Sequence, residues 1–249
     1  MTAPTGPTGP TGLVGRRRDG DVELLTLRRA DRRNALNTAL CTELAAAAQD
    51  AVDTGARVLV ITGDGSAFCA GADLDGVYGD EFLTALYGML HGLTRLPVPI
   101  VAAVNGPAIG AGTQLALACD LRVADERARF AVPTPRNGMA VDAWTIRTLA
   151  AILGGGPARR LLLAAEEVDR TEALAHGLVD RPGTLEDALA WAAEIATLAP
   201  LSLAHNKLVL NGGDDDAVAA SFAACWASED VREAAVARTE KRRPVFTGR

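Results

Sequence analysis

Short apolar runs alternate with helical stretches through the first part of the chain. The apolar runs lie at 22–27, 57–62 and 99–104, and turn residues close the second and the third. The stretches between them, 38–52 and 80–96, are typical of helices. Short apolar runs bounded by turn residues are typical of buried parallel strands, and alternation of strand and helix favours crossover units. The sequence therefore predicts an α/β fold with a mostly parallel sheet.

The pattern changes after about residue 154, where helical stretches follow one another with little strand character. At the other end, residues 2–12 repeat Thr, Gly and Pro and offer no apolar side chain that could anchor them. We therefore expect a flexible tail at 1–20, one core domain at 21–195, and a helical region at 196–249 that packs against a neighbouring subunit. The expected later helices cover 157–165, 171–176, 184–198, 201–210 and 214–238.

The composition argues against several classes of protein. The chain has 249 residues, 49% of them hydrophobic, which is enough for one buried core. Its formal net charge of -6 argues against nucleic-acid binding, because a phosphate-binding surface needs a basic stripe. The sequence contains no recognisable secretory signal and no apolar run of membrane-spanning length. We expect a cytoplasmic protein without membrane insertion.

Cysteine usage indicates neither a disulfide framework nor a zinc site. Cys41, Cys69, Cys119 and Cys225 form no CxxC pair, and the three histidines lie far apart in sequence. A zinc site needs clustered Cys and His. We expect buried free thiols in a reducing compartment, and no metal.

Two loops of small residues are the first candidates for a functional site. They cover 66–74 and 105–114, each between a strand and the next helix. Small residues let a ligand approach the backbone closely, and the second loop opens a helix, whose free N–H groups favour negative charge. Two such loops can form an oxyanion hole. On the residues alone, tight turns made for packing explain them equally well.

Four segments give a more specific indication, and they do so together. Residues 67–74, 104–112, 32–37 and 119–122 closely resemble, in order and spacing, the signatures of the enoyl-CoA hydratase/isomerase (crotonase) family. The resemblance implies an α/β fold of the ClpP/crotonase type, with a mostly parallel sheet, β-β-α units and a C-terminal helical region. It also implies a coenzyme A thioester as ligand, no other cofactor, and a homotrimer or hexamer.

The resemblance assigns roles to individual residues. The backbone N–H groups of Ala72 and Ala111 should bind the thioester oxygen, where one such donor is typically worth roughly 3–4 kcal/mol. A basic C-terminus around Lys241 is expected at the phosphates, with a solvated chain end as the alternative. The acyl pocket is expected among Val77, Tyr78, Phe82, Tyr87 and Leu90, which could equally be core. Coenzyme A binding is expected from Asn34, Ala35, Leu36, Ala70, Asp73 and Leu74.

Both glutamates that the family's hydratases use are replaced in this sequence. Their positions fall on Gln114, in the helix after the second loop, and on Thr134, after Pro133. Hydration needs one group to take a proton from water and another to supply a proton to carbon, and each contributes on the order of 10²–10⁴-fold. An amide does not titrate near neutrality, and a threonine hydroxyl is a very poor base. We therefore expect most of the hydratase rate to be lost.

One carboxylate remains of interest. Asp142 matches the nucleophilic aspartate of 4-chlorobenzoyl-CoA dehalogenases, a related group, but the histidine base of that group falls on Tyr87, with His91 one helical turn further on. The nucleophile is therefore expected to lack its partner. Asp142 also precedes a helical stretch and could cap it. Both interpretations are open.

Three functions follow from these observations. The first is an acyl-CoA-binding protein of lipid metabolism with little hydratase activity, as in a mycobacterial subgroup of the family. The resemblance to that subgroup is carried by residues 105–112, Gln114, residues 130–144 and the segment 237–242 with Pro244. The second is an active hydratase, isomerase or hydrolase that uses Asp142. A purely structural role is disfavoured, because it gives the two loops no reason to keep their small residues.

Overall fold

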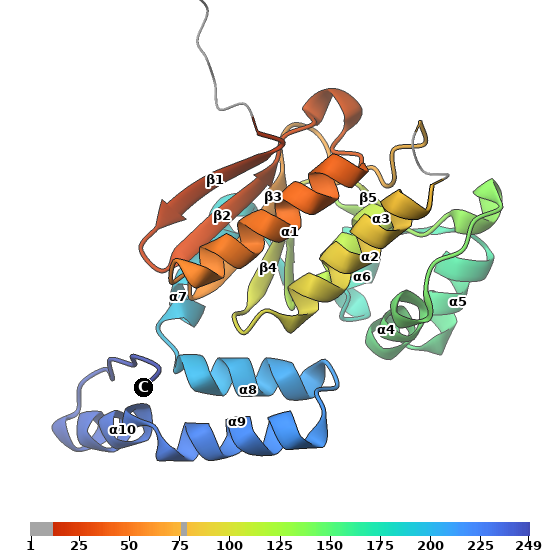
Figure 1. Ribbon diagram of the computed structural model, residues 1–249. Helices are drawn as coiled ribbons and strands as arrows, with labels where there is room; N and C mark the ends of the chain where they lie inside the picture. The colour runs from red at the N-terminus through yellow and green to blue at the C-terminus, as the bar shows by residue number, and fades with distance from the viewer. Residues whose placement is uncertain (1–11, 76–78) are drawn as a thin grey trace, which may run out of the picture.

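The computed structural model describes residues 12–75 and 79–249, and it confirms the mostly parallel sheet (Figure 1). Six strands in the order β1-β2-β3-β4-β6-β9 form the main sheet, in which only β1 and β2 are antiparallel. A second sheet has the order β5-β7-β8. The strands are β1 Val14–Asp19, β2 Val22–Leu27, β3 Val58–Gly63, β4 Ile100–Val104, β5 Ala108–Ile109, β6 Leu121–Ala124, β7 Arg129–Ala131, β8 Glu167–Asp169 and β9 Arg181–Pro182.

The helices follow the expected order with small shifts of their ends. Both stretches predicted between the first strands are helical, as α1 and α2. The helices are α1 Thr38–Asp53, α2 Asp80–Arg95, α3 Ala111–Ala118, α4 Ala143–Leu153, α5 Gly155–Leu163, α6 Arg170–Ala175, α7 Leu185–Ala196, α8 Pro200–Leu210, α9 Asp215–Ala227 and α10 Glu229–Glu240, with 3-10 turns η1 Ala30–Arg32 and η2 Thr134–Asn137.

Helices cover both faces of the main sheet, which explains why its central strands are continuously apolar. All residues of β3 and β4 are buried. The larger core contains Leu59 and Ile61 of β3 and packs against α1, α2 and α3, whereas Val58 and Val60 face α7 on the opposite side. Parallel strands buried on both faces typically read as unbroken apolar runs.

The folded part begins earlier than the sequence predicted. Strand β1 lies inside the segment expected as a flexible tail and pairs with β2 from Val14↔Leu27 to Asp19↔Val22. Only its first two residues are buried, and the arginines of its outer part are exposed. An edge strand of this kind has no apolar periodicity, so the hydrophobic pattern of the sequence did not indicate a strand there. Residues 1–11 of the expected tail lie outside the described residues.

The last stretch predicted as a single helix forms two helices in the structure. The stretch 214–238 divides into α9 and α10 at Ser228, whose hydroxyl donates to Cys225 O (2.7 Å) and accepts from Val231 N (3.4 Å). A serine in the extended conformation that caps the following helix ends one helix and starts another.

The C-terminal helices form a separate layer that is tied to the core by hydrogen bonds from Lys207, Arg57 and Asn211. Figure 1 shows α8–α10 beyond the end of the sheet that lies away from β5 and the start of α3. Lys207 of α8, which is buried, donates to Val98 O (2.9 Å) and Asp120 Oδ2 (2.7 Å). Arg57 beside β3 donates to Phe246 O (3.0 Å) and Leu198 O (2.8 Å).

Within the described ranges, no single helix is both long and apolar enough to cross a bilayer. Only α7 and α8 taken together meet the length and composition criteria, and the two helices are bent by 111° where they join.

Candidate active site: two joined loops and an acyl-sized cavity

The two small-residue loops are held together by backbone hydrogen bonds. Cys69 N donates to Pro107 O (3.1 Å), and Ile109 N donates to Cys69 O (3.0 Å). These bonds make an isolated parallel bridge between Cys69 and Ala108. The loops following β3 and β4 therefore form one rigid unit at the carboxyl ends of adjacent strands.

Two glycines explain why this contact requires small residues. A Cβ on Gly112 would fall well inside van der Waals contact with Cys69 O. Gly71 has φ +110, a conformation that L side chains rarely adopt, and a Cβ there would lie 2.9 Å from Ile109 O. Packing of the two backbones thus demands glycine at both places, so packing alone accounts for part of the motif.

Packing of the two loops does not explain why the backbone N–H groups of Ala72 and Ala111 are left without acceptors. Leu36 N donates to Gly71 O and Asp73 N donates to Leu36 O, both at 2.7 Å, so the Ala72 N–H points away from Leu36. Ala111 is the first residue of α3, where an N–H has no intrahelical acceptor. Neither amide has a protein acceptor among the described residues.

Both residues line one cavity of about 150 Å³. The predicted positions Ala70, Leu74, Gln114 and Thr134 line it as well. Side chains at one-turn spacing on α2 and a loop before α4 supply most of its apolar wall. That wall comprises Phe82, Leu83, Leu86, Tyr87, Met139 and Val141.

The residues expected in an acyl pocket lie only partly at this cavity. Phe82 and Tyr87 line the cavity, whereas Leu90 is fully buried in the core. Val77 and Tyr78 lie outside the described residues. Leu83 and Leu86 were missed, although their spacing from Phe82 and Tyr87 on one helix signals them. Met139 and Val141 lie in irregular backbone, for which the sequence gives no periodic signal.

Among the described residues that line this cavity, none is Asp, Glu or His. Gln114 and Thr134 both reach it, as their alignment with the family's glutamates implied. Gln114 is nearly buried, and its Nε2 donates to Thr145 Oγ1 (2.8 Å). The cavity therefore pairs two free backbone donors with the amide of Gln114 and the hydroxyl of Thr134 and with no carboxylate or imidazole from the described residues.

Asp142 caps a helix, as one of the two interpretations predicted. Its Oδ1 accepts from Thr145 N (3.1 Å) and from Thr145 Oγ1 (2.5 Å) at the start of α4. The expectation that it lacks a histidine partner is wrong, because His91 Nε2 lies 3.3 Å from Asp142 Oδ2. Tyr87 and His91 are one turn apart on α2, so the turn brings His91 to Asp142 while Tyr87 lines the cavity. Asp142 itself is not among the lining residues.

The residues expected to bind coenzyme A differ in what they offer. Asn34 is fully buried, and its Nδ2 donates to Asp64 O (2.8 Å) and Ala67 O (2.9 Å) while its Oδ1 accepts from Arg29 N (3.0 Å). Its side chain therefore ties the η1 loop to the first small-residue loop and is not available to a ligand. Leu36 is also fully buried, which leaves the backbone and Ala35 as the accessible part of that segment.

Asp73 and Leu74 lie at the open edge of the site. Arg29 donates to Asp73 Oδ2 (2.7 Å), and this hydrogen bond holds the pKa of Asp73 below its ordinary value. Arg29 also donates to Ala35 O, so one guanidinium joins both segments expected to bind coenzyme A. Leu74 is 55% exposed beside the cavity, consistent with a place at its mouth.

Lys241 does not approach the cavity within one chain. It is exposed in the left-handed conformation at the end of α10, in the C-terminal layer that Figure 1 shows at the opposite end of the molecule. A contact of Lys241 with a ligand thus requires a second copy of the chain and stays a prediction.

The fourth motif has a structural role. The buried Arg122 guanidinium donates to the carbonyls of Leu178 (2.6 Å) and Cys119 (2.8 Å), and to Ala116 (3.3 Å). It joins the end of α3 to the turn before β9, away from the cavity. The three cysteines of the core are buried free thiols, as predicted, and Cys225 is half-buried.

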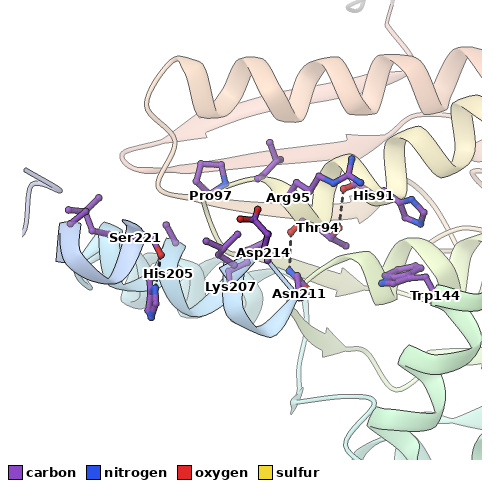
Figure 2. Close-up of a pocket in the computed structure, with 17 residues that line it drawn as sticks. His91, Thr94, Arg95, Pro97, Trp144, His205, Lys207, Asn211, Asp214 and Ser221 are labelled. Atoms are coloured by element: carbon purple, nitrogen blue, oxygen red, sulfur yellow. Dashed lines mark hydrogen bonds between the residues drawn. The ribbon is translucent and has the colours of Figure 1, made fainter. Parts of the chain in front are cut away.

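A second, larger cavity of about 700 Å³ lies between the end of α2, the start of α4 and the helices α8 and α9 (Figure 2). His91 and Trp144 line it from the core side, and Lys207 and Asn211 from α8 and its end. It contains none of the four motif segments' loop residues. We assign the functional site to the smaller cavity, because the free amides open there.

Comparison with known proteins agrees with this geometry. Residues 17–249 match the enoyl-CoA hydratase/isomerase family. The chain belongs to that family. Within it, a Mycobacterium tuberculosis protein called probable enoyl-CoA hydratase echA6 is 49% identical over 232 residues, which are 90% of this chain and 95% of that protein. The Escherichia coli 2,3-dehydroadipyl-CoA hydratase is 38% identical, covering 92% of this chain and 96% of its own.

Solved structures of the family confirm the crotonase fold. The crystal structure of a putative enoyl-CoA hydratase from Streptomyces coelicolor matches with a TM-score of 0.87 at 30% sequence identity, over 100% of this chain and 99% of the other. The predicted α/β class, the mostly parallel sheet and the helical C-terminal region are thus confirmed together.

Proposed function

We propose that this enoyl-CoA hydratase/isomerase family member binds acyl-coenzyme A thioesters and hydrates them little or not at all. The observation that carries the proposal is the cavity in which the Ala72 and Ala111 amides lack protein acceptors while no described lining residue is acidic. Two backbone donors at one cavity suit a thioester oxygen on which negative charge develops. The names of relatives such as the 2,3-dehydroadipyl-CoA hydratase support the acyl-CoA ligand class.

The lack of hydration follows from proton chemistry. Water adds across a double bond only if one group accepts its proton and another protonates carbon. Gln114 and Thr134 occupy the two places and cannot do this near neutrality. A pool of acyl-CoA held intact would suit a carrier or sensor in lipid metabolism.

An active enzyme is the alternative, and the hydratase names of the relatives favour it. A nucleophilic role of Asp142 has less support, since both its oxygens are engaged, by Thr145 and His91, outside the cavity lining. A weak hydratase in which Gln114 orients water is the stronger form of this alternative.

Two measurements on the full chain distinguish an acyl-CoA-binding protein from an active hydratase. Thermal unfolding with saturated acyl-CoAs of rising chain length should show an increase in Tm, because a ligand that binds only the native state stabilises it. Crotonyl-CoA should remain unhydrated under the same conditions. Absence of any shift with every acyl-CoA would refute the binding role, and rapid turnover of crotonyl-CoA would establish the alternative.

We also propose a homotrimer or a hexamer built from C-terminal contacts. Exposed apolar side chains gather on α8 and α9, where Leu210 is 85% exposed, Trp226 67% and Phe222 54%. Exposed apolar groups of this size commonly mark an interface. Light scattering coupled to size exclusion tests this, and a monomer at micromolar concentration would contradict it.

A further inference from the structure

A chain of hydrogen bonds runs from the cavity to the end of α2. Gln114 Nε2 lies 2.8 Å from Thr145 Oγ1, Thr145 Oγ1 lies 2.5 Å from Asp142 Oδ1, and Asp142 Oδ2 lies 3.3 Å from His91 Nε2. Figure 2 shows His91 beside Trp144 at the wall of the larger cavity, so the chain reaches from one cavity to the other. Only its Gln114 end belongs to the site described above.

The donors and acceptors in this chain can be assigned from one end. A carboxylate accepts hydrogen bonds and donates none, so the single hydroxyl hydrogen of Thr145 points to Asp142. Thr145 Oγ1 can then only accept from Gln114, which must turn its NH₂ group toward it. For the same reason His91 Nε2 carries a hydrogen toward Asp142. The orientation of the Gln114 amide is therefore fixed by Thr145 and Asp142.

The opposite end of that amide is open to the cavity. Gln114 is 2% exposed, and its Oε1 accepts no hydrogen bond from the described residues. Among those residues no fully buried side-chain oxygen or nitrogen lacks a partner. Oε1 must therefore be the accessible part of the side chain, and the cavity that Gln114 lines is where it opens.

We propose that Gln114 Oε1 is a fixed acceptor that selects acyl groups bearing a hydroxyl close to the thioester, with Thr145 and Asp142 as positioning residues. The inference rests on the proposed acyl-CoA binding and deepens it. A glutamine free to rotate would meet donors and acceptors equally, whereas this one presents only its oxygen. A hydroxyl on the second or third acyl carbon can donate to it, and a saturated chain leaves it desolvated without a partner.

The test compares dissociation constants of the full chain for butyryl-CoA, 2-hydroxybutyryl-CoA and 3-hydroxybutyryl-CoA by calorimetry. At least one hydroxylated ligand should bind about tenfold more tightly than butyryl-CoA, the usual effect of one satisfied buried acceptor. Equal affinity for all three would overturn the inference and leave the proposed function intact. Binding of none would overturn both.

Variants of the positioning residues distinguish orientation from simple packing. Thr145→Val keeps the shape but loses the hydroxyl, and should bring the affinity ratio close to one, while Thr145→Ser should restore it. Asp142→Asn is the matched control, because an asparagine that caps α4 keeps its Oδ1 on Thr145 N and Oγ1 and leaves Gln114 oriented, so the affinity ratio should stay close to that of the parent. A ratio that survives in Thr145→Val, with Tm close to that of the parent, would show that Thr145 does not hold Gln114 in place and would overturn the inference.

Discussion

Cys69 and Ala108 form a lone parallel bridge, through which Cys69 donates to the residue before Ala108 and accepts from the residue after it. The bridge brings the loops after β3 and β4 to hydrogen-bonding distance just before the amides of Ala72 and Ala111 open into the cavity. The position of those two amides is therefore set by backbone alone, and side-chain substitutions nearby alter it only by breaking the loop contact.

The Ala111 amide can be removed without disturbing the helix that carries it. Ala111 is the first residue of α3, a place where proline fits because the N–H makes no intrahelical bond. Ala111→Pro should reduce acyl-CoA affinity by up to about tenfold, since one hydrogen bond to the neutral thioester oxygen is lost. Calorimetric titration with the acyl-CoA that gives the largest Tm increase measures this.

The matched control is Ala111→Gly, which keeps the N–H and removes only the methyl group. It should bind within a few fold of the parent chain. If Ala111→Pro folds, as shown by an unchanged circular dichroism spectrum, and binds as well as Ala111→Gly, the amide does not contact the ligand.

Restoring both carboxylates should restore hydration. Gln114 and Thr134 line the same cavity as the free amides, so the double variant Gln114→Glu/Thr134→Glu places two carboxyl groups at the positions where the family resemblance expects an acid–base pair. We expect crotonyl-CoA hydration to rise by at least about 10²-fold over the parent, measured as loss of enoyl absorbance. Each single variant serves as a control and should gain much less.

One local obstacle applies to that experiment. Thr145 has one hydroxyl hydrogen, which it cannot give to both Asp142 and a glutamate at 114. Adding Asp142→Asn removes the competing charge and should raise the rate further. No hydration in either combination would mean that the two positions do not face the acyl group.

The sequence predicted the mostly parallel sheet and the two small-residue loops between strand and helix because each depends on short contiguous patterns, whereas the replacement of the two glutamates stays a prediction. Strand β3 is apolar throughout, and the loop after it is rich in small residues, so both are visible locally. The contact between His91 and Asp142 was missed, because it joins residues 51 positions apart on different elements and depends on how α4 packs against α2. Strand β1 was missed because an exposed edge strand carries no apolar periodicity.

Asn34 is predicted to be a stability residue of the site. Replacing it with alanine removes three hydrogen bonds and leaves the buried carbonyl of Ala67 without its donor. The free energy of unfolding should fall by about 2–4 kcal/mol, and acyl-CoA affinity should fall with it. Urea denaturation measures the first.

Asn211 provides a comparison of the same residue type, because its exposed amide makes one hydrogen bond, to Thr94 O at 2.9 Å. Asn211→Ala should cost less than about 1 kcal/mol. Equal losses in the two variants would contradict the anchoring role of Asn34.

Thiol reactivity should report on the loop contact. Burial raises the pKa of Cys41, Cys69 and Cys119 to about 12 in each case, so these thiols are protonated at pH 8 and sterically protected. The half-buried Cys225 should be the one thiol alkylated quickly in the native protein. Mass spectrometry after a short iodoacetamide pulse at pH 8 checks this.

Gly71→Ala, which forces a Cβ toward Ile109 O, should loosen the bridge and expose Cys69 to the reagent. Cys119 lies outside the loops and is the internal control. Fast labelling of Cys69 in the parent chain, or no increase in the variant, would contradict the rigid contact.

The ion pair between Lys207 and Asp120 has a consequence for how the chain can be divided. Burial raises the pKa of Asp120, and Lys207 from α8 is the charge that offsets this effect. A chain cut before α8 would keep the carboxyl group in its apolar setting and lose the only ammonium within reach among the described contacts. The ion pair therefore crosses the boundary between the sheet and the C-terminal layer, and neither part is expected to fold stably without the other.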